Sequence, residues 1–131
     1  MKTTLIIHDE DARGNRIHTV RVPNEQENPT IRDLIQLRIS NEIERFNTQR
    51  PVCFFSLVQP EGAEITSRGY RLKEHRSLDA EAQTRAAIAG FEKKSFLVNA
   101  NGRDYQSLDD KVELKDDTEI VFVKFVEVVG G

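Results

Sequence analysis

Residues 120–131 read Ile-Val-Phe-Val-Lys-Phe-Val-Glu-Val-Val-Gly-Gly. This run is rich in β-branched and aromatic residues, and it predicts a long strand from Ile120 to Val129. Apolar residues fill both the even and the odd positions of its first half, which indicates a central strand covered on both faces. Gly130 and Gly131 follow it directly. We therefore expect residues 128–131 to form a tail that projects from the sheet and needs no proteolytic maturation.

The first part of the chain predicts a hairpin followed by a helix. Thr3 to His8 is an apolar, β-branched run, residues 17–22 alternate between apolar and polar side chains, and a polar turn separates the two. Thr30 is a good N-cap with Asp33 three residues later, a variant of the capping box. Apolar side chains then recur at three- and four-residue steps, which predicts an amphipathic helix. They are Ile31, Leu34, Ile35, Ile39, Ile43 and Phe46.

The middle of the chain is less regular. Residues 52–58 form a short apolar run bounded by prolines, and we interpret this run as a buried strand. Residues 60–77 are polar and predict no clear element. An Ala-rich stretch then predicts a short helix that runs through Phe91, with Ser77 or Asp79 as its N-cap.

The order of these elements predicts the fold class. Phe96 to Val98 indicates another strand, and Asn101-Gly102 is typical of a tight turn after it. A hairpin, a helix and later strands that complete the sheet follow the β-grasp order, in which the first and last strands are parallel neighbours. We predict a single α+β domain over residues 1–131, a ubiquitin-like β-grasp. It has a mixed sheet, one main helix packed across it and a helical insertion at about 60–93, before the C-terminal strands.

The composition excludes several classes of partner and compartment. The net charge is −3 and basic residues are scattered, so the sequence favours no nucleic-acid partner. The single cysteine fits a reducing compartment. The N-terminal apolar run is too short for a signal peptide, and no run approaches the ~20 apolar residues of a membrane span. We expect a soluble, cytoplasmic protein without a membrane partner.

Residues 96–131 resemble the C-terminal half of ubiquitin-like modifiers and of the prokaryotic sulfur carriers of molybdopterin and thiamine biosynthesis. The similar segments share a strand, a turn with a hydrophobic anchor, an acidic turn and an apolar strand that ends in Gly-Gly. They are Phe96-Leu-Val-Asn, Leu108-Asp-Asp-Lys-Val, Leu114-Lys-Asp-Asp-Thr-Glu-Ile-Val-Phe and Val128-Val-Gly-Gly. The helix start, Thr30-Ile-Arg-Asp-Leu-Ile, is similar to the helix start of these families.

The insertion separates the chain from the shorter sulfur carriers. An Ala-rich helix that ends in Gly90-Phe91, followed by Phe96, resembles the ubiquitin-like proteins encoded in bacterial operons. Those proteins are encoded beside activating, conjugating and deconjugating enzymes, and several of them are linked to antiphage defence. The resemblance therefore implies four kinds of partner: a ubiquitin-activating-like enzyme, a conjugating enzyme, an isopeptidase-like deconjugase and a protein target.

The resemblance also implies roles for the C-terminal residues. Gly131 is the acyl donor, activated as an acyl-adenylate and then a thioester, and finally joined to the target through an isopeptide bond. Gly130 supplies clearance in a narrow enzyme channel because it has no Cβ. Val128 and Val129 are tail contacts with the activating enzyme. The chain itself is a substrate and not an enzyme, and it needs no cofactor because the activating enzyme uses the ATP.

Two alternatives remain open at this point. The first is a sulfur carrier that bears a thiocarboxylate on Gly131, and the second is a non-covalent β-grasp module that binds partners or self-assembles. Asp116, Asp117 and Glu119 form an acidic patch, which serves either as turn residues or as a docking site for a basic surface of the activating enzyme. Nothing in the sequence distinguishes these two readings of the patch.

The remaining reactive side chains predict no chemistry. Cys53 lies among apolar residues, so we expect a core cysteine and not a nucleophile. His8 and His18 are predicted to face each other across the hairpin, and with His75 they lack metal-ligand spacing. The acidic turn that begins at Asp9 does not fit a calcium loop, because the required ligand types are missing. We expect no metal site.

Overall fold

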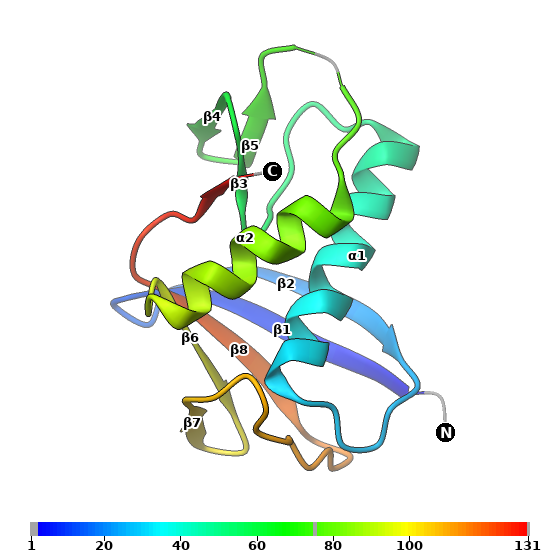
Figure 1. Cartoon of the computed structure of the whole chain (residues 1–131), viewed down its shortest axis with the longest axis vertical. Coiled ribbons are helices and arrows are strands. Elements are labelled where there is room, and N and C mark those ends of the chain that lie inside the picture. The colour runs from blue at the N-terminus through cyan, green and yellow to red at the C-terminus, as the bar shows by residue number, and fades with distance from the viewer. Residues whose placement is uncertain (1–2, 75, 131) are drawn as a thin grey trace.

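The computed structural model of the chain describes residues 3–74 and 76–130 (Figure 1). The fold is α+β, with a mixed five-stranded sheet and two helices. The five strands of the main sheet are β1 (Thr3–Asp11), β2 (Arg16–Asn24), β6 (Phe96–Ala100), β7 (Arg103–Tyr105) and β8 (Glu119–Lys124). The helices are α1 (Ile31–Gln49) and α2 (Ala80–Glu92). The shorter strands are β3 (Gln59–Pro60), β4 (Ala63–Thr66), β5 (Gly69–Leu72) and β9 (Val129–Gly130).

The main sheet has the strand order β2-β1-β8-β6-β7. β1 and β2 form the predicted antiparallel hairpin. β8 lies between β1 and β6 and runs parallel to β1, with Ile7 opposite Ile120. The prediction that the first and last long strands are parallel neighbours at the sheet centre is therefore confirmed.

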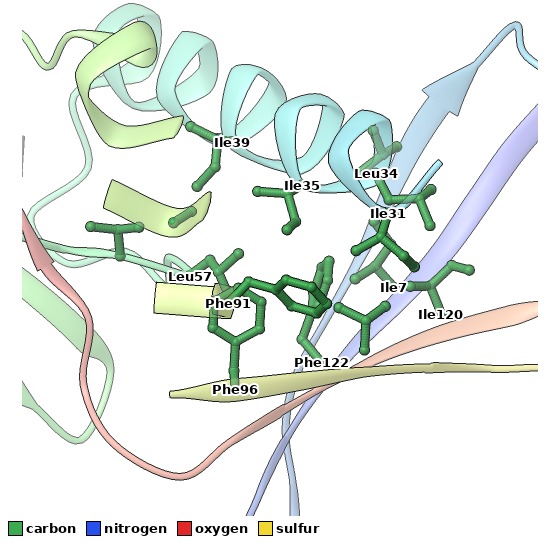
Figure 2. Close-up of a cluster of buried hydrophobic side chains, with 14 of the residues drawn as sticks. Ile7, Ile31, Leu34, Ile35, Ile39, Leu57, Phe91, Phe96, Ile120 and Phe122 are labelled. Atoms are coloured by element: carbon green, nitrogen blue, oxygen red, sulfur yellow. The ribbon is translucent and has the colours of Figure 1, made fainter. Parts of the chain in front are cut away.

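Helix α1 begins as the sequence predicts. The Thr30 hydroxyl accepts from the Asp33 backbone N–H at 3.1 Å, and the Asp33 carboxylate accepts from the Thr30 N–H at 3.0 Å, which completes a capping box. Both helices cover the same face of the sheet, with α2 crossing α1 (Figure 1). Figure 2 shows Ile35 and Ile39 of α1 pointing toward sheet side chains that include Phe122.

The insertion packs on the core. It contains the β4–β5 hairpin and the predicted helix α2, for which Asp79 is the N-cap. The Asp79 carboxylate accepts from the Glu81 backbone N–H at 3.0 Å. Leu78, Ala87 and Phe91 from this insertion belong to the main hydrophobic core, and α2 therefore acts as a second layer beside α1.

The predicted strand at residues 52–58 is wrong. This segment is irregular, with one bridge between Phe54 and Tyr70, although Leu57 and Val58 are buried. Side chains satisfy part of its backbone, because the Leu57 N–H donates to the Glu42 carboxylate at 3.1 Å. Only the end of the run, at Leu57 and Val58, fills the core, whereas Val52 is 77% exposed. Where a side-chain acceptor satisfies the backbone, as at Leu57, a neighbouring strand is not required.

The predicted last strand is also too long, and it is covered on one face only. β8 ends at Lys124, and residues 125–128 belong to no strand. Ile120 and Phe122 face the helices and are fully buried, whereas Val121 and Val123 are half-buried on the opposite face. Because both helices cover the same face, the apolar residues at odd positions have no covering layer.

Candidate functional site

The candidate site is the C-terminal segment, which we define as residues 125–130. The predicted acyl donor, Gly131, lies outside the described residues. The chain leaves the sheet after Lys124, where the backbone N–H groups of Phe125 and Val126 both donate to the Ser95 carbonyl, at 2.9 and 3.2 Å. This shared acceptor turns the chain away from the sheet and directs it toward α2 and the insertion (Figure 1).

Residues 128–130 are docked on the rest of the molecule. The Gln59 backbone N–H donates to the Val128 carbonyl at 2.7 Å, and β9 pairs with β3 in parallel. The Gln83 side chain donates from Nε2 to the Gly130 carbonyl at 3.1 Å. The expectation of a tail that projects from the sheet is therefore wrong for residues 128–130, because the insertion supplies hydrogen-bond partners that the sequence pattern does not reveal.

The predicted tail contacts differ in exposure. Val128 is 7% exposed and belongs to the hydrophobic core, whereas Val129 is 57% exposed. In this docked arrangement Val129 is open to a partner, and Val128 is covered by the chain itself. The structure therefore places the two valines in different environments, although they are adjacent in sequence.

Two glycines allow the segment to pack closely on α2. A Cβ on Gly90 would lie 2.6 Å from Val128 Cγ2, and a Cβ on Gly130 would lie 2.8 Å from the Ala86 Cβ. Both distances are far inside van der Waals contact, so Gly90 provides the space for Val128. The missing Cβ of Gly130 likewise provides the space for its contact with Ala86 of α2. Its predicted clearance in an enzyme channel stays a prediction.

A polar cluster ties the start of the segment to the β4–β5 hairpin. The Tyr70 hydroxyl donates to the Glu127 carboxylate, and Lys124 Nζ donates to Tyr70 Oη at 3.1 Å. Lys124 Nζ also lies 3.6 Å from the Glu127 carboxylate. Burial raises the pKa of Tyr70 above its ordinary value, and the hydrogen bond to Glu127 raises it further. Tyr70 is therefore a protonated donor at neutral pH.

A buried network of charged side chains lies near this polar cluster. Arg38 is 1% exposed and forms a two-pronged ion pair with Asp9, at 2.6 and 2.7 Å. Its Nε donates to Glu42 at 2.9 Å, and the other Glu42 oxygen accepts from the Ser56 hydroxyl at 2.6 Å. Burial raises the pKa of Glu42, and Arg38 opposes that rise. The network joins β1, α1 and the irregular segment that leads to β3.

The sequence reasoning missed this network, although a signal was present. Arg38 and Glu42 fall on the apolar stripe of α1, between Ile35, Ile39 and Ile43. A charged residue on a buried helix face requires a partner of opposite charge. The charged positions within the apolar stripe were therefore the indication of a buried ion pair.

The acidic patch lies away from the C-terminal segment. Asp116 and Asp117 are exposed in the turn before β8, and Glu119 is exposed where that strand begins. The segment leaves the opposite end of β8, and a strand of this length spans roughly 20 Å. The structure therefore does not bring the acidic patch together with residues 128–130. Glu119 instead lies 3.1 Å from His8 Nε2.

The predicted pairing of His8 with His18 is wrong. In the hairpin register, His8 lies opposite Thr19, and His18 lies opposite Asp9. Neighbouring positions on a strand point to opposite faces, so the two imidazoles diverge. His18 instead stacks on Phe55, with ring centroids 4.7 Å apart. His75 lies outside the described residues.

Two other sequence interpretations can be placed in the structure. Cys53 is half-buried and does not belong to the main hydrophobic core, so the expectation of a core cysteine is wrong. Its sulfur lies 3.8 Å from the Thr66 hydroxyl. The acidic hairpin turn is closed by Asp11, whose carboxylate accepts from the Arg13 and Asn15 backbone N–H groups, each at 2.9 Å. Within residues 3–74 and 76–130, no three side chains of the His, Cys, Asp and Glu types gather as a metal site would require.

No family model, no curated protein and no solved structure matches the chain. Among the residues that the structure describes, no helix combines the length and the apolar character needed to cross a membrane.

Proposed function

We propose that this chain is a ubiquitin-like modifier with a β-grasp fold, which a bacterial conjugation pathway attaches to target proteins. The observation that carries the proposal is the sheet order β2-β1-β8-β6-β7, with β1 and β8 parallel at the centre and α1 across one face. A Gly-Gly pair follows this central strand by a short segment. This combination of topology and C-terminal residues is what a ubiquitin-like modifier requires.

The proposed chemistry uses the carboxylate of Gly131. That carboxylate attacks the α-phosphate of ATP in the activating enzyme, which forms an acyl-adenylate and releases pyrophosphate. A cysteine thiolate of the enzyme then displaces AMP and forms a thioester. A lysine amine of the target finally displaces the thiolate and loses a proton, leaving an isopeptide bond. This chain supplies the acyl group and no catalytic side chain, and it acts as a cytoplasmic substrate, in a pathway of antiphage defence.

The side chains near the reacting end have proposed roles of different kinds. Gly130 and Gly131 pass through a narrow channel because neither has a Cβ. Val129, which is exposed, contacts the activating enzyme first, and Val128 contacts it once the segment is released. Asp116, Asp117 and Glu119 remain a docking patch for a basic surface of the enzyme, at the far end of β8 from the channel.

Intact mass spectrometry tests the proposal. The protein is incubated with ATP and the ubiquitin-activating-like enzyme of the proposed pathway, and a variant that lacks Gly131 is the matched control. We expect an adenylate on the protein or an enzyme adduct that dithiothreitol removes, and neither with the control. A mass gain equal to replacement of one oxygen by sulfur would instead identify a sulfur carrier.

The docking of residues 128–130 favours a second candidate, a non-covalent β-grasp interaction module. In such a module β9 is a permanent part of the fold, and the carboxylate of Gly131 has no chemical role. Unchanged masses in the same experiment, together with full function in vivo of the variant that lacks Gly131, would support this candidate over the modifier.

A further inference from the structure

We infer that the docked C-terminal segment is a closed, self-inhibited state of the acyl donor, and that residues 127–130 must detach from α2 and β3 before Gly131 can react. This inference rests on the proposed function and specifies how its reacting end is regulated. A narrow enzyme channel has to surround an extended Gly-Gly pair. In the closed state Gly130 packs closely against Ala86, and its carbonyl accepts a hydrogen bond from the Gln83 side chain.

The contacts that hold the segment closed are few and local. One buried side chain, Val128, fits against Gly90, and one backbone hydrogen bond joins it to Gln59. The β3–β9 pairing covers two residues on each strand, whereas β1 and β8 pair over six. A region with so few buried contacts can open while the main sheet stays folded.

The contacts of residues 125–127 indicate where the C-terminal segment detaches. Phe125 and Val126 are held to Ser95, on the sheet side, and both are largely exposed, at 46% and 59%. Beyond them, Glu127 is held by Tyr70, on the side of the insertion. Opening between Val126 and Glu127 therefore breaks the contacts of Glu127 with Tyr70 and Lys124, and it breaks the Val128 packing. It leaves the strand pairing of β8 and the hydrogen bonds of residues 125 and 126 to Ser95 unchanged.

The closed state has a direct consequence for reactivity. If an enzyme binds only the open segment, its apparent affinity for the protein equals its affinity for the open state multiplied by the open fraction. Changes that expel Val128 from its site should raise the reaction rate without any new contact to the enzyme. Gly90 controls this equilibrium, although it lies in α2 and does not take part in the chemistry.

The key variant is Gly90→Ala. Alanine favours a helix interior over glycine, so α2 itself is strengthened, but the added Cβ would lie 2.6 Å from Val128 Cγ2. Val128→Ala removes the packing from the other side. The double variant restores a fit, because the added Cβ then faces the alanine Cβ at 3.4 Å, an ordinary contact.

The first measurement needs no enzyme. Hydrogen exchange of the Gln59 N–H, which donates to Val128, reports whether the segment is closed. We expect exchange about tenfold faster or more in each single variant, and a return toward the wild-type rate in the double variant. Unchanged β1 amides in the same spectra show that the sheet remains folded. Equal Gln59 exchange in Gly90→Ala and the wild type would overturn the inference.

The second measurement compares thioester formation by the wild type and by Gly90→Ala at limiting enzyme. We expect the variant to react several-fold faster, in proportion to its larger open fraction. Equal rates, with faster Gln59 exchange in the variant, would overturn the inhibitory role and leave the modifier function standing. An absence of adduct with both proteins would overturn the proposed function itself, and with it the inference.

Discussion

The two halves of the apolar run at residues 120–130 adopt different structures and pack against different elements. β8 lies between two strands under a pair of helices, whereas the C-terminal segment leaves the sheet and docks on the insertion through a few contacts. Both halves are apolar and β-branched, so the pattern alone gives them the same structure. A hydrophobic run therefore predicts burial or strand pairing. Which elements it packs against, and how stably, depends on residues that are distant in sequence.

The largest expected difference between the two regions concerns a pair of phenylalanines. Phe122 is fully buried, 5.9 Å from the Phe96 ring centroid, and Phe125 is 46% exposed. Phe122→Ala should lower the free energy of unfolding by about 3–5 kcal/mol, because it leaves a cavity in the core. Phe125→Ala is the matched control and should cost less than ~1 kcal/mol. Urea denaturation measures both, and similar losses would contradict the distinction.

The next expected effect concerns the buried charge network around Arg38. Arg38→Met leaves Asp9 and Glu42 buried without their cation, and it should destabilise the fold by about 3–5 kcal/mol. Arg45→Met, on the exposed side of the same helix, is the control and should change stability by less than about 0.5 kcal/mol. Thermal unfolding distinguishes them. An Arg38→Met protein as stable as the control would refute the importance of the network.

A smaller effect is expected at the hydrogen bond between Tyr70 and Glu127, one of the contacts that hold the segment closed. Tyr70→Phe removes the hydroxyl that donates to Glu127 and accepts from Lys124. The loss is roughly 1 kcal/mol and falls on the docked segment, so the Gln59 N–H should exchange about fivefold faster. Amides of β1 should be nearly unaffected. Equal acceleration in both places would mean that the segment and the sheet open together.

The smallest expected effect is a pH dependence at the stacked histidine. Burial lowers the pKa of His18, and nearby Asp9 opposes that change, so the unfolded chain binds the proton more readily than the folded one. The contribution of neutral His18 to the stability of the fold is therefore fully present above the ordinary histidine pKa of about 6.5. It is lost as the pH falls below that value. His18→Gln should remove this part of the slope. Denaturation of both proteins between pH 5 and 8 measures the difference.

Local signals in the sequence predicted much of the fold. The hairpin, the capping box at Thr30 and the N-cap at Asp79 depend on contacts within a few residues, and each is present. The Asn101-Gly102 turn is also present, with positive φ at both residues, as a tight hairpin turn requires. The parallel pairing of β1 with β8 followed from element order, because alternatives are few.

The remaining features depend on contacts between distant parts of the chain. The break after Lys124 depends on Ser95, and the docking of Val128 depends on the absence of a side chain at Gly90. The apolar residues at 52–58 predicted burial correctly at Leu57, but the Leu57 N–H donates to the distant Glu42 side chain and not to a neighbouring strand. The spacing of hydrophobic residues does not reveal which distant groups accept hydrogen bonds from the backbone.

Native-state hydrogen exchange in low concentrations of urea shows whether the C-terminal segment and the sheet open separately. If the C-terminal segment opens as a separate unit, the Gln59 N–H exchanges through a local opening that urea barely accelerates. The amides of β1 and β8 then exchange only through global unfolding, with a steep dependence on urea. We therefore expect two distinct slopes and two distinct free energies of opening. A single slope and a single free energy for Gln59, β1 and β8 would contradict it, because the segment would then be an inseparable part of the sheet's cooperative unit.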